Sequence, residues 1–116
     1  MRVYVISPYR ADTPEQLDVH VDYAQMAIRD CILRGEFPFA SHLLYPGALN
    51  DEDPVERKMG IYAGHAFAML CDLGVIYADL GTSSGMKDDI DFLELHNIPL
   101  EVRQLNWRPH GWPNTR

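Results

Sequence analysis

The stretch LGVIYADLGTSSGMKDDIDFLELHNIPLEV, residues 73–102, decides the fold class. It begins with a continuously apolar run, residues 73–78, which is typical of a central strand buried in a parallel sheet. A loop of Gly, Ser and Thr follows, and the apolar spacing after it predicts a helix over residues 86–96. Residues 98–102 form the next predicted strand. This order of elements predicts two parallel strands joined by a crossover helix.

The same alternation runs through the start of the chain. Residues 2–6 form a β-branched run that predicts a first strand. Thr13, Pro14 and Gln16 supply a helix cap, a proline suited to the first helical position and the partner of a capping box. We therefore expect a helix that begins there and stops at Gly35.

Two more elements are expected in the middle of the chain. Residues 37–44 are apolar and short enough for a second strand, although Pro38 weakens that prediction. After a turn-rich loop, Asp53 and the proline that follows it predict a helix over residues 54–71. Because this helix is apolar on most sides after Met59, we expect it to be well buried.

Strands alternating with helices predict an α/β fold: a Rossmann- or flavodoxin-like parallel sheet of about four to five strands with helices on both faces. A chain of 116 residues fits a single domain, which we expect over residues 1–104. Residues 105–116 are rich in Pro, Gly and polar side chains and predict an irregular tail. Its Trp107 and Trp112 are compatible with a partner contact or with packing on their own subunit.

Charge and composition narrow the function classes. The net charge is −7 and the basic residues are scattered, so we expect no binding to a nucleic-acid polymer. No apolar run reaches the ~20 residues of a membrane span, and the N-terminus lacks a signal-peptide pattern, which predicts a cytoplasmic protein with no membrane contact. Cys31 and Cys71 lack metal-ligand spacing and are expected to be buried free thiols. We predict no metal and no cofactor.

Three polar segments follow predicted strands: residues 7–10, 40–45 and 79–85. Ligands of open parallel sheets bind at the carboxyl ends of the strands, so we expect these segments to meet at one edge. The Gly/Ser loop offers backbone N–H groups and the positive end of a helix dipole, which favour an anion such as phosphate. The alternative is a plain turn in which Ser83 or Ser84 caps the helix.

Three carboxylates, Asp88, Asp89 and Asp91, lie at the start of this helix. Acids in a first helical turn are favourable, so a solvated helix face is one interpretation. Asp89 differs because it borders the apolar face of the helix, and an ionised carboxylate there suits a nucleophile or an electrostatic stabiliser. A shared Mg²⁺ site is a further alternative, although consecutive helical residues project about 100° apart.

Three segments resemble the nucleoside 2-deoxyribosyltransferase-like superfamily, and most of all its small phage and bacterial members of unsettled function. They are CDLGVIYADLGTSSGMKDDIDFLELHNIPLEV (residues 71–102), VYVISPYR (3–10) and PFASHLLYPGALND (38–51). The pattern is an Asp before an apolar strand, a Ser/Gly loop, and an acid four residues after the loop Gly. The resemblance covers the chain to about residue 103. It implies the same α/β fold, a nucleoside or nucleotide ligand, and a homodimer or larger homo-oligomer.

The resemblance also implies roles for site residues. In the superfamily, the acid four residues after the loop Gly is a Glu that attacks the anomeric carbon; here it is Asp89, one methylene shorter. Base-exchanging transferases carry an Asp two residues before the loop Gly, where this chain has Ser83. The 2′-deoxynucleoside 5′-phosphate N-hydrolase branch has Ser there. Ser83 and Ser84 are therefore expected to hold a 5′-phosphate, with Arg10 as its charged partner or, alternatively, as a surface side chain.

Five more residues are expected at the same edge. Tyr9 and Tyr45 are predicted to line the base or sugar pocket, because aromatic faces stack on bases, or to pack at its rim. Ser7 and Gly85 complete the predicted binding set. His42 is predicted as a general acid, the alternative being a strand-end histidine bonded to backbone.

Two residues are expected to be structural. His65 lies inside an apolar helix and is interpreted as a hydrogen-bonded core histidine. Asp72 precedes the central strand and is expected to cap or pair there.

Besides a metal-assisted phosphohydrolase that would use the three aspartates as Mg²⁺ ligands, two classes of function stay open. The first is an enzyme that cleaves the N-glycosidic bond of a (deoxy)nucleoside 5′-monophosphate or related nucleoside with Asp89 as nucleophile, by hydrolysis or, alternatively, as a base-exchanging deoxyribosyltransferase. The second is a non-catalytic protein of the same fold that binds or sequesters a nucleotide, because Asp89 is too short to attack.

Overall fold

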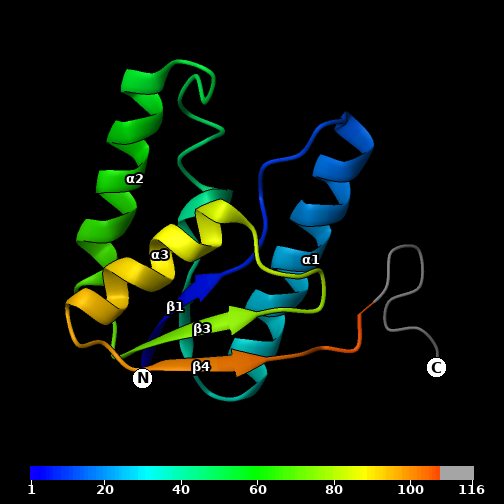
Figure 1. Ribbon diagram of the computed structural model, residues 1–116. Coiled ribbons are helices and arrows are strands. Elements are labelled where there is room, and N and C mark those ends of the chain that lie inside the picture. The colour runs from blue at the N-terminus through cyan, green and yellow to red at the C-terminus, as the bar shows by residue number, and fades with distance from the viewer. Residues whose placement is uncertain (108–116) are drawn as a thin grey trace.

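Four parallel strands form one sheet in the computed structural model, which describes residues 1–107 (Figure 1). Along the chain the elements are β1 (Arg2–Ile6), α1 (Pro14–Leu33), β2 (Phe37–Phe39), the short 3₁₀ helix η1 (Ser41–Leu43), α2 (Pro54–Ala68), β3 (Leu73–Tyr77), α3 (Ser84–Leu95) and β4 (Leu100–Arg103). The strand order is β2-β1-β3-β4 and all three pairings are parallel. The predicted α/β class is confirmed.

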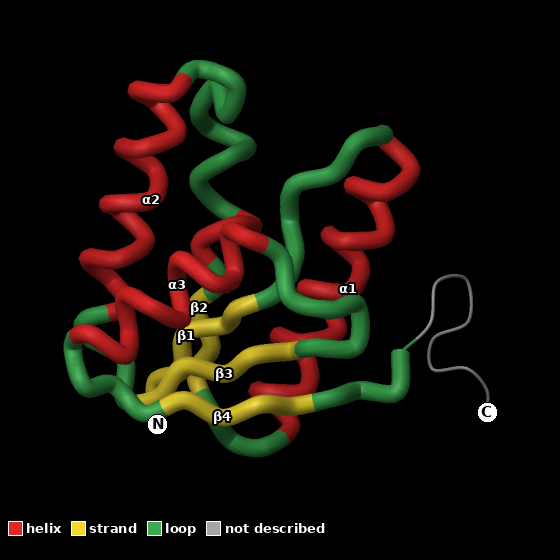
Figure 2. Tube along the Cα trace, viewed as in Figure 1, coloured by secondary structure: helices red, strands yellow, loops and turns green. Residues whose placement is uncertain are grey.

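Helices cover both faces of the sheet (Figure 2). Alternate side chains of each strand point to opposite faces, so β1 sends Val3 and Val5 toward α1 and sends Tyr4 and Ile6 toward α2 and α3. The α1 side of the core is built around Tyr23, Ala27, Cys31, Val75 and Tyr77, and the α3 side around Ala68, Ile76, Met86 and Leu93. Both central strands are thus buried on both faces, which explains their continuously apolar sequences.

The predicted caps at Thr13 and Asp53 form, whereas the predicted capping box does not, because Gln16 accepts from the residue before the N-cap. The Thr13 hydroxyl accepts a hydrogen bond from the Gln16 N–H at 3.1 Å, and the Gln16 side chain accepts one from the Asp12 N–H at 2.7 Å. Asp53 caps α2 by accepting from the Val55 N–H at 3.0 Å. These contacts satisfy N–H groups that have no partner inside the helix.

The predicted strand over residues 37–44 is wrong beyond Phe39, because β2 ends there and the chain turns into η1. β2 is an edge strand, where Pro38 is tolerated without a ladder hydrogen bond. The next residues turn across the end of β1, where the Ser41 hydroxyl bonds the Tyr4 hydroxyl at 2.8 Å.

The prediction that the α2 helix is well buried is also wrong. The helix ends at Ala68, and its buried residues are Gly64 and Ala68. Figure 1 places α2 at the opposite side of the molecule from α1, with its first turns rising beyond the sheet. Its exposed large apolar side chains are Val55, Met59, Ile61, Tyr62 and Phe67.

The last helix and strand are shifted by about two residues from their predicted bounds, because the chain is capped differently at each end. Ser83 is the N-cap of α3, so the helix begins at Ser84. Asn97 adopts a φ of 58°, which ends the helical path and delays β4 to Leu100. Asp72 has the structural role predicted for it: its carboxylate accepts the Arg2 N–H at 2.8 Å.

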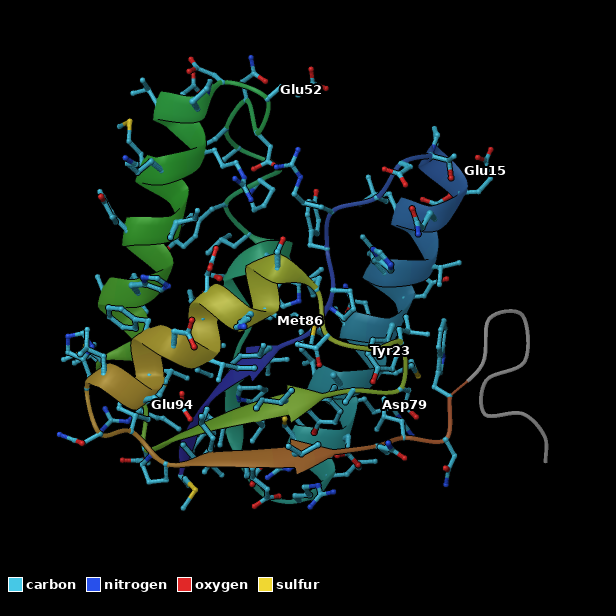
Figure 3. The ribbon with its side chains drawn as sticks, viewed as in Figure 1. Glu15, Tyr23, Glu52, Asp79, Met86 and Glu94 are labelled. Atoms are coloured by element: carbon cyan, nitrogen blue, oxygen red, sulfur yellow. The ribbon has the colours of Figure 1, made fainter. Side chains whose placement is uncertain are left out.

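Residues 105–107 fold back onto the domain through a group that we call the Asp79 clasp. The Asp79 carboxylate accepts hydrogen bonds from the Tyr23 hydroxyl at 2.6 Å and from the N–H groups of Leu105 and Trp107 at 2.8 and 3.2 Å. Figure 3 shows Tyr23 and Asp79 facing one another. Trp107 is buried against Tyr23, so it packs on its own subunit, whereas Trp112 lies outside the described residues.

Cys31 and Cys71 are both free, as predicted, and Cys31 is buried; the expected burial of Cys71 is wrong, because Cys71 follows the exposed end of α2 and is partly exposed. Among the helices of residues 1–107, none is long and apolar enough to cross a membrane.

Candidate functional site

A cavity of about 160 Å³ lies at the carboxyl ends of the strands. The strand order reverses between β1 and β3, and ligands of this topology bind at that reversal. All nine residues predicted for the site line this one cavity: Ser7, Tyr9, Arg10, His42, Tyr45, Ser83, Ser84, Gly85 and Asp89. Because they come from three separate segments, the expected convergence at one edge is observed, while their chemical roles stay predictions.

Two hydrogen bonds between side chains join the end of β1 to η1. Ser7 follows β1 directly, and its hydroxyl lies 2.7 Å from His42 Nε2. The Tyr4 and Ser41 hydroxyls are 2.8 Å apart. The Tyr9 ring meets the His42 ring edge-on, with centroids 6.4 Å apart. This wall of the cavity therefore carries polar side chains, and hydrogen bonds between them fix their positions.

Burial lowers the pKa of His42 to about 4, because the charged imidazolium would lose its hydration. The imidazole is then neutral at pH 7. A neutral imidazole carries no extra proton to donate, so the general-acid role predicted for His42 is weakened. Its contact with Ser7 favours a role as a hydrogen-bonding group instead.

Asp89 lies on α3 and is held from α2. His65 Nε2 is 2.9 Å from Asp89 Oδ1, and the two side chains are 15% and 27% exposed. The interpretation of His65 as a core histidine therefore missed its partner, the predicted nucleophile. The contact joins two helices and has no signal in the local sequence pattern.

The start of α3 presents hydroxyl and backbone groups to the cavity. Ser83 Oγ accepts the Met86 N–H at 3.2 Å, so this hydroxyl caps the helix and keeps its own proton for another acceptor. Ser84 and Gly85 are exposed on the cavity wall. A Cβ added at Gly85 would meet no atom within 4 Å apart from its chain neighbours and the backbone of its own helix, so space is open beside it.

The cavity carries charges that sequence reasoning missed. Besides Arg10, its lining includes Arg57 of α2, whose Nε lies 3.8 Å from the Asp51 carboxylate. Glu56 also lines it, as does Asp88, for which a solvated helix face was one interpretation. Helical spacing could have indicated the α2 residues, because positions 56, 57, 60 and 61 share one side of a helix.

Tyr4 is a further lining residue absent from the predicted set. Burial raises the pKa of its hydroxyl, and the negative charge of Asp89 raises it further, so it stays protonated. The sequence offered one indication of this role, namely that the Tyr4 hydroxyl is a polar group inside the apolar run of residues 2–6.

The three aspartates considered as Mg²⁺ ligands do not lie together at one site. Asp88 and Asp89 line the cavity, whereas Asp91 does not. Within residues 1–107, no group of three His, Cys, Asp or Glu side chains is placed to hold a metal ion.

Together the fold and cavity define an α/β domain of flavodoxin-like topology with a carboxylate-bearing site at the reversal between β1 and β3. The chain belongs to the domain family of unknown function DUF7768, whose model matches residues 1–103. None of the curated proteins matches the sequence.

Among solved structures, the chain is similar to a 2-deoxyribosyltransferase from the psychrotolerant bacterium Bacillus psychrosaccharolyticus. The TM-score is 0.61 at 14% sequence identity, and the match covers 99% of this chain and 80% of the transferase. The resemblance noted in the sequence is therefore confirmed at the level of the fold.

Proposed function

We propose that this protein cleaves the N-glycosidic bond of a (deoxy)nucleoside 5′-monophosphate or a related nucleoside, with Asp89 as the nucleophile. The observation that carries the proposal is the cavity itself. It brings a carboxylate, a serine-bearing helix start and two tyrosines together at the ligand-binding edge of a deoxyribosyltransferase-like fold. That solved protein is a 2-deoxyribosyltransferase, and this chain shares its fold.

Each part of the cavity has a role in the proposal. The phosphate lies at the start of α3, where Ser83, Ser84 and the Gly85 backbone offer donors and Arg10 offers a positive charge. The base stacks on Tyr9 or Tyr45. This arrangement turns the anomeric carbon toward Asp89.

The reaction takes two steps. In the first step, an Asp89 oxygen forms a bond to C1′ while the C1′–N bond breaks. The electron pair of the broken bond leaves with the base, and the base takes up a proton from solvent. Water then attacks C1′, loses a proton to solvent and returns the bonding pair to the carboxylate. Hydrolysis is favoured over transfer to another base because Ser83 stands where the resembling transferases carry an Asp.

A binding protein without turnover is the second candidate. Asp89 is one methylene shorter than the nucleophile of the superfamily, and one of its oxygens already bonds His65. A misplacement of about 1 Å is enough to reduce a rate on the order of a hundredfold. In this candidate the same cavity holds the nucleotide and releases it unchanged.

The deciding experiment incubates the protein with nucleosides and their 5′-monophosphates, in deoxy and ribo forms, and follows free base by chromatography. We expect base release from a monophosphate, and its loss in Asp89→Ala. Asp91→Ala is the matched control, because Asp91 lies on the same helix outside the cavity. Adding a second free base tests transfer, which would appear as a new nucleoside.

The other outcomes are distinct. A thermal shift with the same ligands but no base release would replace the enzyme by the binding protein. The absence of both base release and a thermal shift would contradict both candidates.

We also propose that the protein forms a homodimer or larger homo-oligomer through α2. Its exposed stripe consists of Val55, Met59, Tyr62 and Ala66 and continues to Met69 at the C-cap, at alternating spacings of four and three residues. This is the spacing of a helix seam that packs against another helix. A second copy pairing antiparallel to the first would cover both stripes at once, as two-fold symmetry requires.

A further inference from the structure

We infer that His65 is a positioning residue that holds the Asp89 carboxylate in the orientation for attack. This inference rests on the proposed function, because it concerns the same nucleophile. His65 Nε2 donates to Asp89 Oδ1 at 2.9 Å, across the gap between α2 and α3. The hydrogen bond uses Oδ1 and so leaves Oδ2 for the substrate.

His65 acts through Asp89 and does not contact the ligand. Asp89 lines the cavity, whereas His65 lies outside its lining. His65 is also the less exposed of the two, at 15% against 27%. The imidazole is therefore behind the carboxylate as seen from the cavity.

The imidazole is itself fixed in place. Its ring stacks on Phe92 of α3 with centroids 3.9 Å apart and planes 13° from parallel. The preceding residue, Gly64, holds α2 against η1, since a Cβ there would lie 2.9 Å from the Ser41 Cβ. The stacking on Phe92 and the close approach of α2 to η1 both favour this position of the imidazole.

The same hydrogen bond is kept through the reaction. In the free enzyme Oδ1 is a carboxylate oxygen, and in the glycosyl intermediate, where Oδ2 is bonded to C1′, it becomes the carbonyl oxygen of an ester. Both accept a hydrogen bond from His65 Nε2. The contact therefore fixes the side-chain torsion of Asp89 in both steps.

The test measures kcat and KM for base release in wild type, His65→Leu and His65→Gln. We expect His65→Leu to lower kcat on the order of tenfold to a hundredfold while KM changes by less than about threefold, because orientation is lost and ligand contacts are kept. His65→Gln should recover most of kcat, because its side-chain amide can place a donor near the position of Nε2.

A matched control separates this role from packing. The His96 ring also lies against Phe92, with centroids 4.3 Å apart and planes tilted by 37°, and His96 Nδ1 bonds the Phe92 carbonyl at 2.9 Å. His96→Leu removes a ring from the same stack without touching Asp89, so kcat should stay at the wild-type value. Thermal melts of all variants check that each is folded.

The outcomes separate the inference from the function on which it rests. A wild type that releases base, with His65→Leu unchanged in kcat, overturns the positioning role alone. Equal losses in His65→Leu, His65→Gln and His96→Leu also overturn it, because the effect would then be one of packing. A wild type that releases no base overturns the proposed function, and the inference with it.

Discussion

A substitution at Gly85 tests where the ligand binds without disturbing the fold. A Cβ at this position meets no atom within 4 Å outside its chain neighbours and its own helix backbone, and Gly85 lies in the first turn of α3 on the cavity wall. We expect Gly85→Ala to keep or slightly raise the unfolding midpoint, because alanine is the better helix former. The methyl group would occupy ligand space and weaken monophosphate binding by about tenfold, or roughly 1.4 kcal/mol.

The measurement pairs thermal melts with titration calorimetry. Lys87→Ala is the control, since Lys87 is exposed on the same helix and lies outside the cavity lining. Unchanged affinity in Gly85→Ala would show that no ligand lies against the start of α3.

His42 gives a prediction in pH. Its folded-state pKa of about 4 is below the ordinary value of about 6.5, so between these values the unfolded chain binds a proton that the folded protein excludes. Stability is therefore complete above about pH 6.5 and is lost as the pH falls toward 4. On moving from pH 7 to pH 4.5, wild type should lose about 2 kcal/mol more than His42→Gln in urea unfolding.

The comparison with His42→Gln is needed because carboxylates also titrate in this range. Glutamine keeps a hydrogen-bonding group near Ser7 and does not titrate. Parallel losses in the two proteins would mean that His42 accepts its proton at an ordinary pH when folded.

At the residue scale, the sequence predicted those side chains that follow a strand. Ser7, His42 and Ser83 could be assigned to one edge because parallel strands carry their carboxyl ends together. His65 and Arg57 could not, because each reaches the site from a helix face. Which helix faces meet depends on tertiary packing, and no local pattern records it.

Helix α2 shows why an apolar sequence does not by itself predict burial. Its two buried residues, Gly64 and Ala68, are small and allow close approach to the sheet side. Its larger apolar residues are mostly exposed, including Tyr62 at 63% and Met59 at 58%. No part of residues 1–107 covers this stripe, and we assign it to a second copy.

The proposed dimer can be tested on this helix. Tyr62→Glu places a charge in the stripe, which a desolvated helix pair does not tolerate. We expect the variant to sediment as a monomer at concentrations where wild type does not. Its own fold should survive, because Tyr62 is exposed in the single chain.

The matched control is Ile32→Glu, on the C-terminal turn of α1. Ile32 is 58% exposed and lies on a different helix, so the change in charge and polarity is similar. This variant should keep the wild-type oligomeric state. Loss of assembly in both, or in neither, would contradict an α2 interface.

The elements that the sequence located less well are the short ones. β2 has three residues and η1 has three, and both depend on where the end of β1 lies. The Tyr4–Ser41 and Ser7–His42 hydrogen bonds fix this turn, and both join residues that are more than thirty positions apart. Local apolar content could suggest an extended segment there, but not the position where it stops.

For the whole molecule, the alternation of elements was enough to predict the class. An apolar run followed by an amphipathic helix leaves little choice but a parallel sheet covered on both faces. The strand order β2-β1-β3-β4 needed the structure, since the sequence does not state on which side of β1 each new strand is added. That order determines where the site lies.

The Asp79 clasp contributes to the stability of the whole domain. Burial alone would raise the pKa of Asp79, but the hydrogen bonds from Tyr23 and from the backbone of residues 105–107 outweigh it and lower the pKa. Asp79→Ala leaves these donors without their acceptor. We expect it to reduce the free energy of unfolding by about 1–3 kcal/mol in urea titrations.

Asp12→Ala is a suitable control, because Asp12 is an exposed acid in the loop before α1. It should change stability by less than about 0.5 kcal/mol. Equal effects of the two changes would show that the clasp contributes no more than an ordinary surface acid.

The clasp also bears on where the folding unit ends. The family model stops at residue 103, yet two of the three groups that Asp79 binds belong to Leu105 and Trp107. A chain cut at the family boundary would keep every strand and helix, but it would expose Tyr23 and leave Asp79, at the start of the loop that leads to Ser83, with Tyr23 as its remaining partner in the clasp. The boundary shared by relatives and the boundary needed for a closed core are then different, and the latter lies at least four residues further along.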